Sequence, residues 1–307
     1  MPGLAGYQGD LLLVANPVSG QGAVGRHLGE VEELLRELGV AVLVVETEGP
    51  GDGREAAAEF REGVILSFGG DGTFNEVLNG ADLDRCVLGV IPAGTGNVLA
   101  KELGLSHNPR LALQALAQGK VTDYDLAVCN GQRCACVCGA GVDADIVRVV
   151  HEQRRRHLTQ LHYVPFLIHR ALRPRDWKVR VEVDGRCVAP SANVVCVSNS
   201  RSYGGPIEVT PAASPTDGLL DVMATRITNV AEILQPGTAA LLRGLHASGS
   251  ALYARGRNIR LSSPLEEVPC QVDGDYCGSL PARIHVEPGR LRLLTPRSFA
   301  PRVKGYR

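Results

Sequence analysis

The sequence predicts an α/β domain with a parallel sheet, followed by a mainly antiparallel β-sandwich domain. In the first 122 residues, short continuous apolar runs alternate with segments of helical periodicity. That alternation is typical of a parallel sheet covered by helices on both faces. From Asp123 onward, strand-like segments are separated by Asn-Gly, Asp-Gly and Pro-Gly pairs, which favour antiparallel hairpins.

The expected elements of the first domain follow one another in strand–helix order. Buried strands are expected over residues 10–17, 40–47, 64–68 and 85–92, and helices over 25–39, 53–63 and 74–80. Residues 93–104 are expected to be a loop that leads into a further helix. The segments richest in glycine come directly after strands. In a parallel sheet, ligands bind outside the carboxyl ends of the strands, so these loops are the first place to look for a site.

The second domain is expected over residues 123–294, with the C-terminal segment 295–307 returning to the first domain (1–122). Two helical stretches interrupt its strands, one over about 143–173 and one over about 229–245. The first contains the basic cluster Arg154–Arg156 beside apolar residues. A basic amphipathic helix can rest on an anionic membrane, although a solvated basic face packed on a core gives the same pattern.

Composition limits the classes of partner. The net charge of −1 and the aromatic content of 4% argue against nucleic acid as a partner. We expect neither a membrane-spanning helix nor a secretory signal. Three of the nine cysteines, Cys134, Cys136 and Cys138, alternate along a strand, which favours buried apolar packing over a metal site. A reducing cytoplasm suits them best.

The stretch SFGGDGTFNEVLNG, residues 67–80, places glycines around Asp71 at a predicted strand-to-helix junction. Successive glycines let backbone N–H groups approach a ligand, and a helix N-terminus attracts phosphate. An aspartate there would repel phosphate unless a divalent cation lay between them, so Asp71 is expected to face a Mg²⁺–phosphate pair. The alternative is a simple helix N-cap with flexible glycines.

A second glycine loop, PAGTGNVLAKEL at residues 92–103, follows the next predicted strand. Adjacent parallel strands would bring the two loops side by side, and two N–H cradles suit a triphosphate. Neither loop has the Gly-Lys-Ser/Thr ending of a Walker loop, and neither has the spacing of a dinucleotide fold.

Taken together, these segments resemble the diacylglycerol-kinase-type lipid kinases, which include bacterial lipid kinases, ceramide kinases and sphingosine kinases. The matching stretches are NPVSGQG, ETEGPGDGREAA, GGDGTFNEVLNG, PAGTGNVLA, GAGVDADIV, the run VSNSRSYGGPIEVTPAASPTDGLLDV and QVDGDY, between about residues 10 and 280. The resemblance implies a nucleotide-binding domain like that of NAD kinases and phosphofructokinases. It also implies transfer of the ATP γ-phosphoryl group to a lipid hydroxyl.

The resemblance also implies roles for individual residues. The expected nucleotide contacts are Asn16, Thr47, Gly69, Gly70, Asp71, Gly72, Thr73, Asn75, Glu76, Gly94, Thr95 and Asn97. A structural Mg²⁺ would be held by Asp217 and the Leu219 carbonyl, with Ser214 as a third ligand, although Asp217-Gly218 also fits a plain β-turn. The β-rich domain would face the lipid, which implies a cytoplasmic protein working peripherally at the inner membrane surface.

The catalytic pair would be Asp71 and Asp275, with Asp275 as the general base. The family usually reads Asp-Gly-Glu where this chain reads Asp273-Gly274-Asp275, so the base is one methylene shorter. Val98 stands where the family often has aspartate. Two alternatives stay open. One is a soluble-substrate kinase that shares the GGDGT loop, such as an NAD kinase or a phosphofructokinase, and the other is a nucleotide-binding protein whose catalysis has decayed at Val98 and Asp275.

Overall fold

The computed structural model describes residues 3–5, 7–154, 177–203, 207–226, 251–264 and 267–301, and they form two compact units. The first unit contains the described parts of residues 1–126, 215–217 and 287–305. The second contains those of residues 127–214 and 218–286. Two long strands, β5 (Lys120–Cys129) and β18 (Ala282–Thr295), contribute residues to both units.

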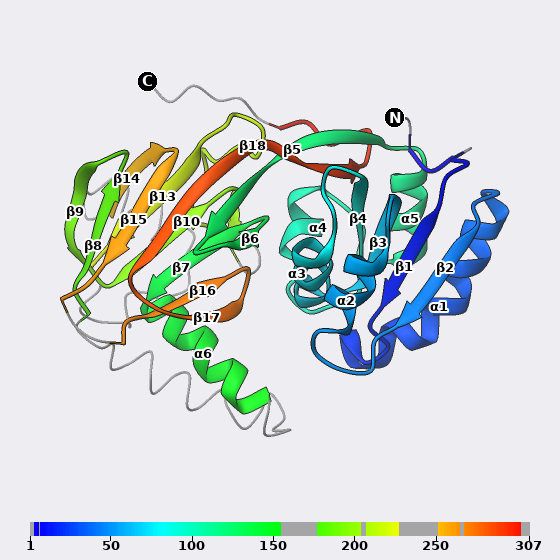
Figure 1. Ribbon diagram of the computed structural model, residues 1–307, viewed down its shortest axis with the longest axis horizontal. Coiled ribbons are helices and arrows are strands. Elements are labelled where there is room, and N and C mark those ends of the chain that lie inside the picture. Colours follow the sequence, from blue (N-terminus) through cyan, green and yellow to red (C-terminus); the bar gives the residue numbers. More distant parts are fainter. Residues whose placement is uncertain are drawn as a thin grey trace. The chain divides into compact units, whose positions relative to one another are not determined.

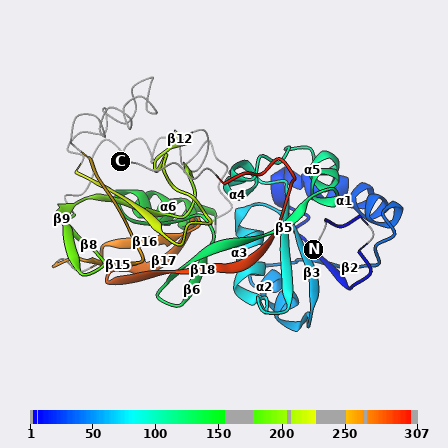
Figure 2. The ribbon, with the colours of Figure 1, turned by 90° about the horizontal axis from the view of Figure 1, so that it is seen from above.

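The first unit is built on a parallel sheet in the order β2-β1-β3-β4. Its strands are β1 (Leu11–Ala15), β2 (Val42–Glu46), β3 (Gly63–Gly69) and β4 (Cys86–Pro92). Its helices are α1 (Ser19–Glu37), α2 (Asp52–Glu59), α3 (Asp71–Gly80), α4 (Val98–Glu102) and α5 (Pro109–Ala117). Helices α1 and α5 lie on one face of the sheet and α2 and α3 on the other (Figures 1 and 2).

Burial along this sheet follows the apolar pattern of each strand. Strands β1 and β4 are buried along their whole length, and β3 is buried from its second residue, as expected for strands covered on both faces. Strand β2 is different. It was predicted to be a buried strand, but it is the edge strand of the sheet, and Leu43 is 59% exposed. An apolar run alone does not reveal whether a strand has one neighbour or two.

The second unit is a sandwich of two antiparallel sheets, which confirms the predicted fold class. One sheet has the order β14-β13-β10-β7-β16-β17, and the other contains β8, β9, β15 and part of β18. The strands are β6 (Gln132–Cys134), β7 (Val137–Gly141), β8 (Val179–Val183), β9 (Arg186–Ala192), β10 (Val194–Ser198), β11 (Ser202–Tyr203), β12 (Ile207–Glu208), β13 (Leu220–Thr225), β14 (Ala251–Gly256), β15 (Asn258–Ser262), β16 (Pro269–Val272) and β17 (Asp275–Ser279). One apolar core joins Val181 and Ile259 of one sheet to Val195 and Val222 of the other.

Helix α6 (Val142–Arg154) begins where a helix was predicted and packs on β7, β16 and β17. The rest of that predicted helix, residues 155–173, and the predicted helix over 229–245 lie outside the described residues. Within the described chain, no helix is long and apolar enough to cross a membrane. The three alternating cysteines are buried and free of disulfides.

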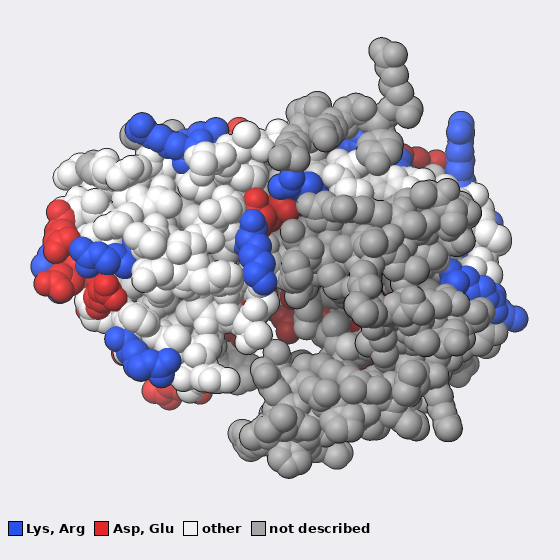
Figure 3. All heavy atoms as spheres, turned by 180° about the vertical axis from the view of Figure 1, so that it is seen from behind, with Lys and Arg blue, Asp and Glu red and all other residues white. Residues whose placement is uncertain are grey.

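Figure 3 shows how charged side chains lie over one face of the described atoms. Lysine and arginine occur there in small groups that alternate with aspartate and glutamate. Mixed groups of this kind produce no broad field of one sign over the described part of that face.

Candidate active site

Three loops meet at the carboxyl edge of the parallel sheet in the first unit. They follow β1, β3 and β4, and backbone hydrogen bonds hold them together. The Asn16 N–H donates to the Phe68 carbonyl at 3.0 Å, and the Ala93 N–H donates to the Gly69 carbonyl at 2.8 Å. The sequence therefore correctly predicted that the two glycine loops would be neighbours.

Glycine is required where these loops touch. A Cβ added to Gly94 would lie 2.6 Å from the Gly70 Cα, closer than side chains pack. A Cβ added to Gly20, whose φ is +60°, would overlap the Ala93 carbonyl oxygen. By contrast, a Cβ on Gly72 would meet no atom within 4 Å. The glycines thus serve two purposes, because some allow loop-to-loop contact and Gly72 borders open space.

Asp71 joins the two glycine loops. Its Oδ1 accepts a hydrogen bond from the Val98 N–H at 2.7 Å, across 27 residues of sequence. Burial raises the pKa of the Asp71 carboxyl, while the N–H groups of Val98, Asn97 and Leu99 act in the opposite direction. The N-cap of α3 is Gly70, and no side chain caps this helix. The Asp71 carboxylate therefore bonds to the second glycine loop and does not cap its own helix.

Asn97 closes the second loop. It adopts a left-handed conformation, with φ of 48°, and its Oδ1 accepts from the Gly94 N–H at 2.9 Å. Its Nδ2 donates to the Gly94 carbonyl at 2.6 Å. Both ends of the amide are therefore used inside the loop, and Thr95 is left exposed at the tip.

Asn16 carries a polar atom that the described protein leaves unsatisfied. Its Oδ1 is buried and has no hydrogen-bond partner among the described residues. A buried acceptor without a donor costs free energy, and such atoms often mark the place of a ligand. Thr47 is buried at the end of β2, and its N–H donates to the Ala15 carbonyl at 2.9 Å.

Helix α3 supplies the other expected contacts. Thr73 is buried, and a Cβ on Gly69 would overlap its Oγ1. Asn75 is also buried, and its Oδ1 accepts from Asn79 at 2.8 Å.

Glu76 was expected to contact the nucleotide, but in the structure its carboxylate bonds to backbone N–H groups of the protein. It accepts from the Gly51 N–H at 2.9 Å and the Gly53 N–H at 3.1 Å, so its carboxylate holds the N-terminus of α2. Its predicted nucleotide contact stays a prediction.

The other expected residues are divided between the two units. Asp275 is the half-buried first residue of β17 in the second unit. Ser214 and Leu219 also belong to the second unit, and Asp217 to the first. The Ser214 Oγ is buried without a hydrogen-bond partner among the described residues, which fits an oxygen ligand of a hard cation. Among the described residues, no group of three or more His, Cys, Asp or Glu could hold a metal ion.

Asp273 is a residue whose part in this region the sequence reasoning missed. Its carboxylate accepts from three consecutive N–H groups, those of Ala135, Cys136 and Val137, at 2.7 to 2.9 Å. It therefore anchors the turn that leads into Asp275. The only sequence signal at this position was the Asp-Gly pair. It predicted a turn, but it did not predict the hydrogen bonds from the N–H groups of residues 135–137.

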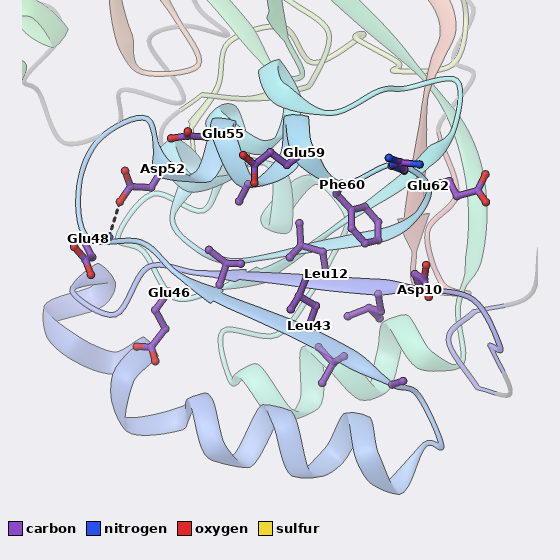
Figure 4. Close-up of a pocket in the computed structure, with 16 residues that line it drawn as sticks. Asp10, Leu12, Leu43, Glu46, Glu48, Asp52, Glu55, Glu59, Phe60 and Glu62 are labelled. Atoms are coloured by element: carbon purple, nitrogen blue, oxygen red, sulfur yellow. Dashed lines mark hydrogen bonds between the residues drawn. The ribbon is translucent and has the colours of Figure 1, made fainter.

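A cavity of about 910 Å³ lies elsewhere in the first unit, between α2 and the strands β1 and β2 (Figure 4). Its acidic lining residues are Asp10, Glu46, Glu48, Asp52, Glu55, Glu59 and Glu62. No residue of either glycine loop lines it, and its carboxylates would repel a triphosphate. The cavity and the glycine loops are thus separate features.

Comparison with known proteins agrees with this geometry. A family model described as the diacylglycerol kinase catalytic domain matches residues 10–129. A second, described as the YegS C-terminal NAD kinase beta sandwich-like domain, matches residues 136–295. A diacylglycerol kinase of Bacillus subtilis is 32% identical over 278 residues, covering 88% of this chain and 90% of the relative.

The chain belongs to the diacylglycerol kinase family. It is a kinase, and the family implies ATP as its phosphoryl donor. A diacylglycerol kinase of Mycobacterium tuberculosis is 28% identical over 304 residues, covering 94% of this chain and 96% of the relative. A crystal structure from Bacillus anthracis has a TM-score of 0.75 at 23% identity, covering 94% of this chain and 98% of that chain, which supports the fold.

Proposed function

We propose that this kinase transfers the γ-phosphoryl group of ATP to the hydroxyl group of diacylglycerol or a closely related lipid. The observation that carries the proposal is the contact of two glycine loops, at Gly70 and Gly94, on the carboxyl edge of a parallel sheet. Relatives named diacylglycerol kinase cover nearly the whole chain, and they favour a lipid over a soluble acceptor.

In this proposal, the two loops hold the phosphate tail of ATP. Backbone N–H groups at the start of α3 would approach the phosphates, because no side chain at Gly72 blocks them. The unpaired Asn16 Oδ1 would accept a hydrogen bond from the nucleotide. Phosphoryl transfer depends mainly on such positioning and on neutralising charge.

Magnesium fits the oxygen atoms present, although each assignment is a proposal. Asp71 would lie on the cation–phosphate side of the first loop, and Ser214, Asp217 and Leu219 would supply a hydroxyl, a carboxylate and a carbonyl to a structural ion. When bound, Mg²⁺ neutralises charge on the transferring phosphate oxygens. Oxygen atoms of these kinds are the ligands that this cation prefers.

Asp275 would act as general base. It would take the proton of the lipid hydroxyl as the new oxygen–phosphorus bond forms and the bond to ADP breaks. Base catalysis contributes about 10²–10⁴-fold, so an aspartate in place of the longer glutamate can still serve. The kinase would bind its lipid substrate at the membrane surface, and the β-rich unit would face the lipid.

The test is an acceptor panel with [γ-³²P]ATP and Mg²⁺. The panel contains mixed micelles of diacylglycerol, of a sphingoid base and of phosphatidylglycerol, together with NAD⁺ and fructose 6-phosphate in solution. We expect label in phosphatidic acid. Label in NADP⁺ or in a sugar bisphosphate would instead identify a soluble-substrate kinase. ATP binding measured by calorimetry without label in any acceptor would identify a nucleotide-binding protein.

A further inference from the structure

The second unit contains a hydrogen-bonded chain that ends at the turn before Asp275. It begins at Asp143 in the first turn of α6, whose Oδ2 accepts from the Gln271 Nε2 at 3.1 Å. The Oε1 of Gln271 then accepts from the Gly274 N–H at 2.8 Å. Both ends of one amide are thus committed, which fixes its orientation.

The absence of a side chain at Gly139 leaves space for this chain of hydrogen bonds. Gln271 is 1% exposed, and Gly139 is its direct partner on β7. A Cβ on Gly139 would lie 2.7 Å from the Gln271 Nε2 and would overlap the Asp143 carboxylate. Only glycine at this position leaves room for the amide and the carboxylate to meet.

The turn that these residues hold is tight. Asp273 and Gly274 have φ of 48° and 85°, and Val272 pairs directly with Asp275 across the two-residue loop. Paired positive φ values are those of a hairpin turn of type I′. The turn is held on one side by the Asp273 carboxylate against β7 and on the other by Gln271. The place of Asp275 is therefore set by its two preceding residues.

We propose that Asp143 is a positioning residue of the kinase, acting through Gln271 and Gly274 to fix the placement of Asp275. The inference rests on the proposed role of Asp275 as general base. A base one methylene shorter than glutamate has less reach, and a misplacement of about 1 Å can cost about 10²-fold in rate. A carboxylate and an amide that fix the turn would limit that loss.

The test is a double-mutant cycle between Asp143→Leu and Asp275→Asn, followed by kcat, by KM for ATP and by melting temperature. In the wild-type background, we expect Asp143→Leu to lower kcat by about 10- to 100-fold, with KM for ATP unchanged within about twofold. In the Asp275→Asn background, we expect a further loss of less than about threefold, because the group being positioned is gone.

Two further variants separate positioning from folding. Asp143→Asn keeps an acceptor for Gln271 and should hold kcat within about threefold of wild type. Gln271→Met removes both the donor to Asp143 and the acceptor for Gly274, so it should repeat the loss and replaces Asp143→Leu in the cycle if that variant does not fold. Asp184→Leu is a control for loss of stability alone, since Asp184 has a φ of 46° and accepts from the Arg257 and Asn258 N–H groups in the same unit. It should lower the melting temperature and leave kcat unchanged.

The outcomes distinguish failure of the positioning role of Asp143 from failure of the proposed base Asp275. If Asp275→Asn is strongly impaired and Asp143→Leu lowers kcat equally in both backgrounds, the positioning role is wrong and the proposed function stands. If Asp143→Leu folds and keeps full kcat, the positioning role is also wrong. If Asp275→Asn itself keeps full kcat, the proposed base is wrong, and the positioning role falls with it.

Discussion

The Asp71 carboxylate accepts a hydrogen bond from the Val98 N–H at 2.7 Å, and this bond joins the loop after β3 to the loop after β4. The family often carries an acid at the position of Val98. Here that residue contributes its backbone, and the side chain of Asp71 holds the start of α4. One carboxylate therefore has a structural partner on one oxygen, while its other oxygen lies beside Gly96.

Asp71→Ala and Asp71→Asn should have different effects on stability but similar effects on activity. The alanine variant leaves the Val98 N–H without its acceptor, which should lower stability by about 1–3 kcal/mol. The asparagine variant keeps an acceptor and should melt near the wild-type temperature. Both remove the charge expected to face the cation and phosphate, so both should lose at least about 10²-fold in kcat.

Thermal melts and [γ-³²P]ATP turnover measure the two effects separately. Asp82→Ala is the control, because Asp82 also accepts a backbone N–H, that of Asp84, on an exposed loop of the same unit. It should keep wild-type turnover. Wild-type turnover in Asp71→Ala would overturn the assignment of Asp71 to the nucleotide.

Much of the fold could be predicted from local patterns. The apolar runs in residues 10–17, 64–68 and 85–92 predicted three strands of the parallel sheet, and the Asp273-Gly274 pair predicted a hairpin turn. The exposure of Leu43 could not be predicted, because strand order depends on how distant segments pair.

The partners of the site carboxylates escaped sequence reasoning for the same physical reason. Glu76 holds Gly51 and Gly53, which precede it by 25 and 23 residues. Asp143 reaches Gln271 across 128 residues. Such partners are determined by contacts between loops in the folded protein. The spacing of residues along the chain therefore does not predict these contacts.

Gly72→Ala should weaken ATP binding without loss of stability. A Cβ at Gly72 meets no protein atom, and alanine in place of a helical glycine adds about 0.5–1 kcal/mol of helix propensity. The same Cβ would stand between the phosphates and the N–H groups of α3. We expect a melting temperature equal to or above wild type and KM for ATP raised at least about 10-fold.

The matched control is Gly29→Ala in α1, which also lies in a helix with no atom near the added Cβ. It should gain the same stability and keep the wild-type KM for ATP. If both variants bind ATP normally, the start of α3 is not the phosphate cradle.

Asn16→Leu should weaken ATP binding without destabilising the ligand-free protein. The Asn16 Oδ1 has no partner among the described residues, so removing it should leave the melting temperature of the ligand-free protein unchanged or slightly higher. The increase in melting temperature on adding ATP and Mg²⁺ should become smaller, because at a fixed concentration a ligand that binds more weakly stabilises the folded state less. An undiminished increase would show that the nucleotide does not meet this atom.

Asp143→Asn should stabilise the protein more at pH 8 than at pH 5. Burial raises the pKa of Asp143 from its usual 3.8 to about 7, and the hydrogen bond from Gln271 acts against that rise. Between these two values, the folded state keeps a proton that the unfolded state has released. Wild-type stability therefore falls as pH rises from about 4 to about 7, whereas asparagine does not titrate.

The size of the effect can be bounded. A pKa shift of about three units corresponds to about 4 kcal/mol, which is an upper limit for the change between pH 4 and pH 7. Cys196 on β10 is a titratable neighbour of Asp143, and burial raises the pKa of its thiol well above the usual value, so it stays neutral throughout. Melts of both proteins from pH 4 to pH 8 measure the gap, and a gap that is constant across this range would place the Asp143 pKa near its ordinary value.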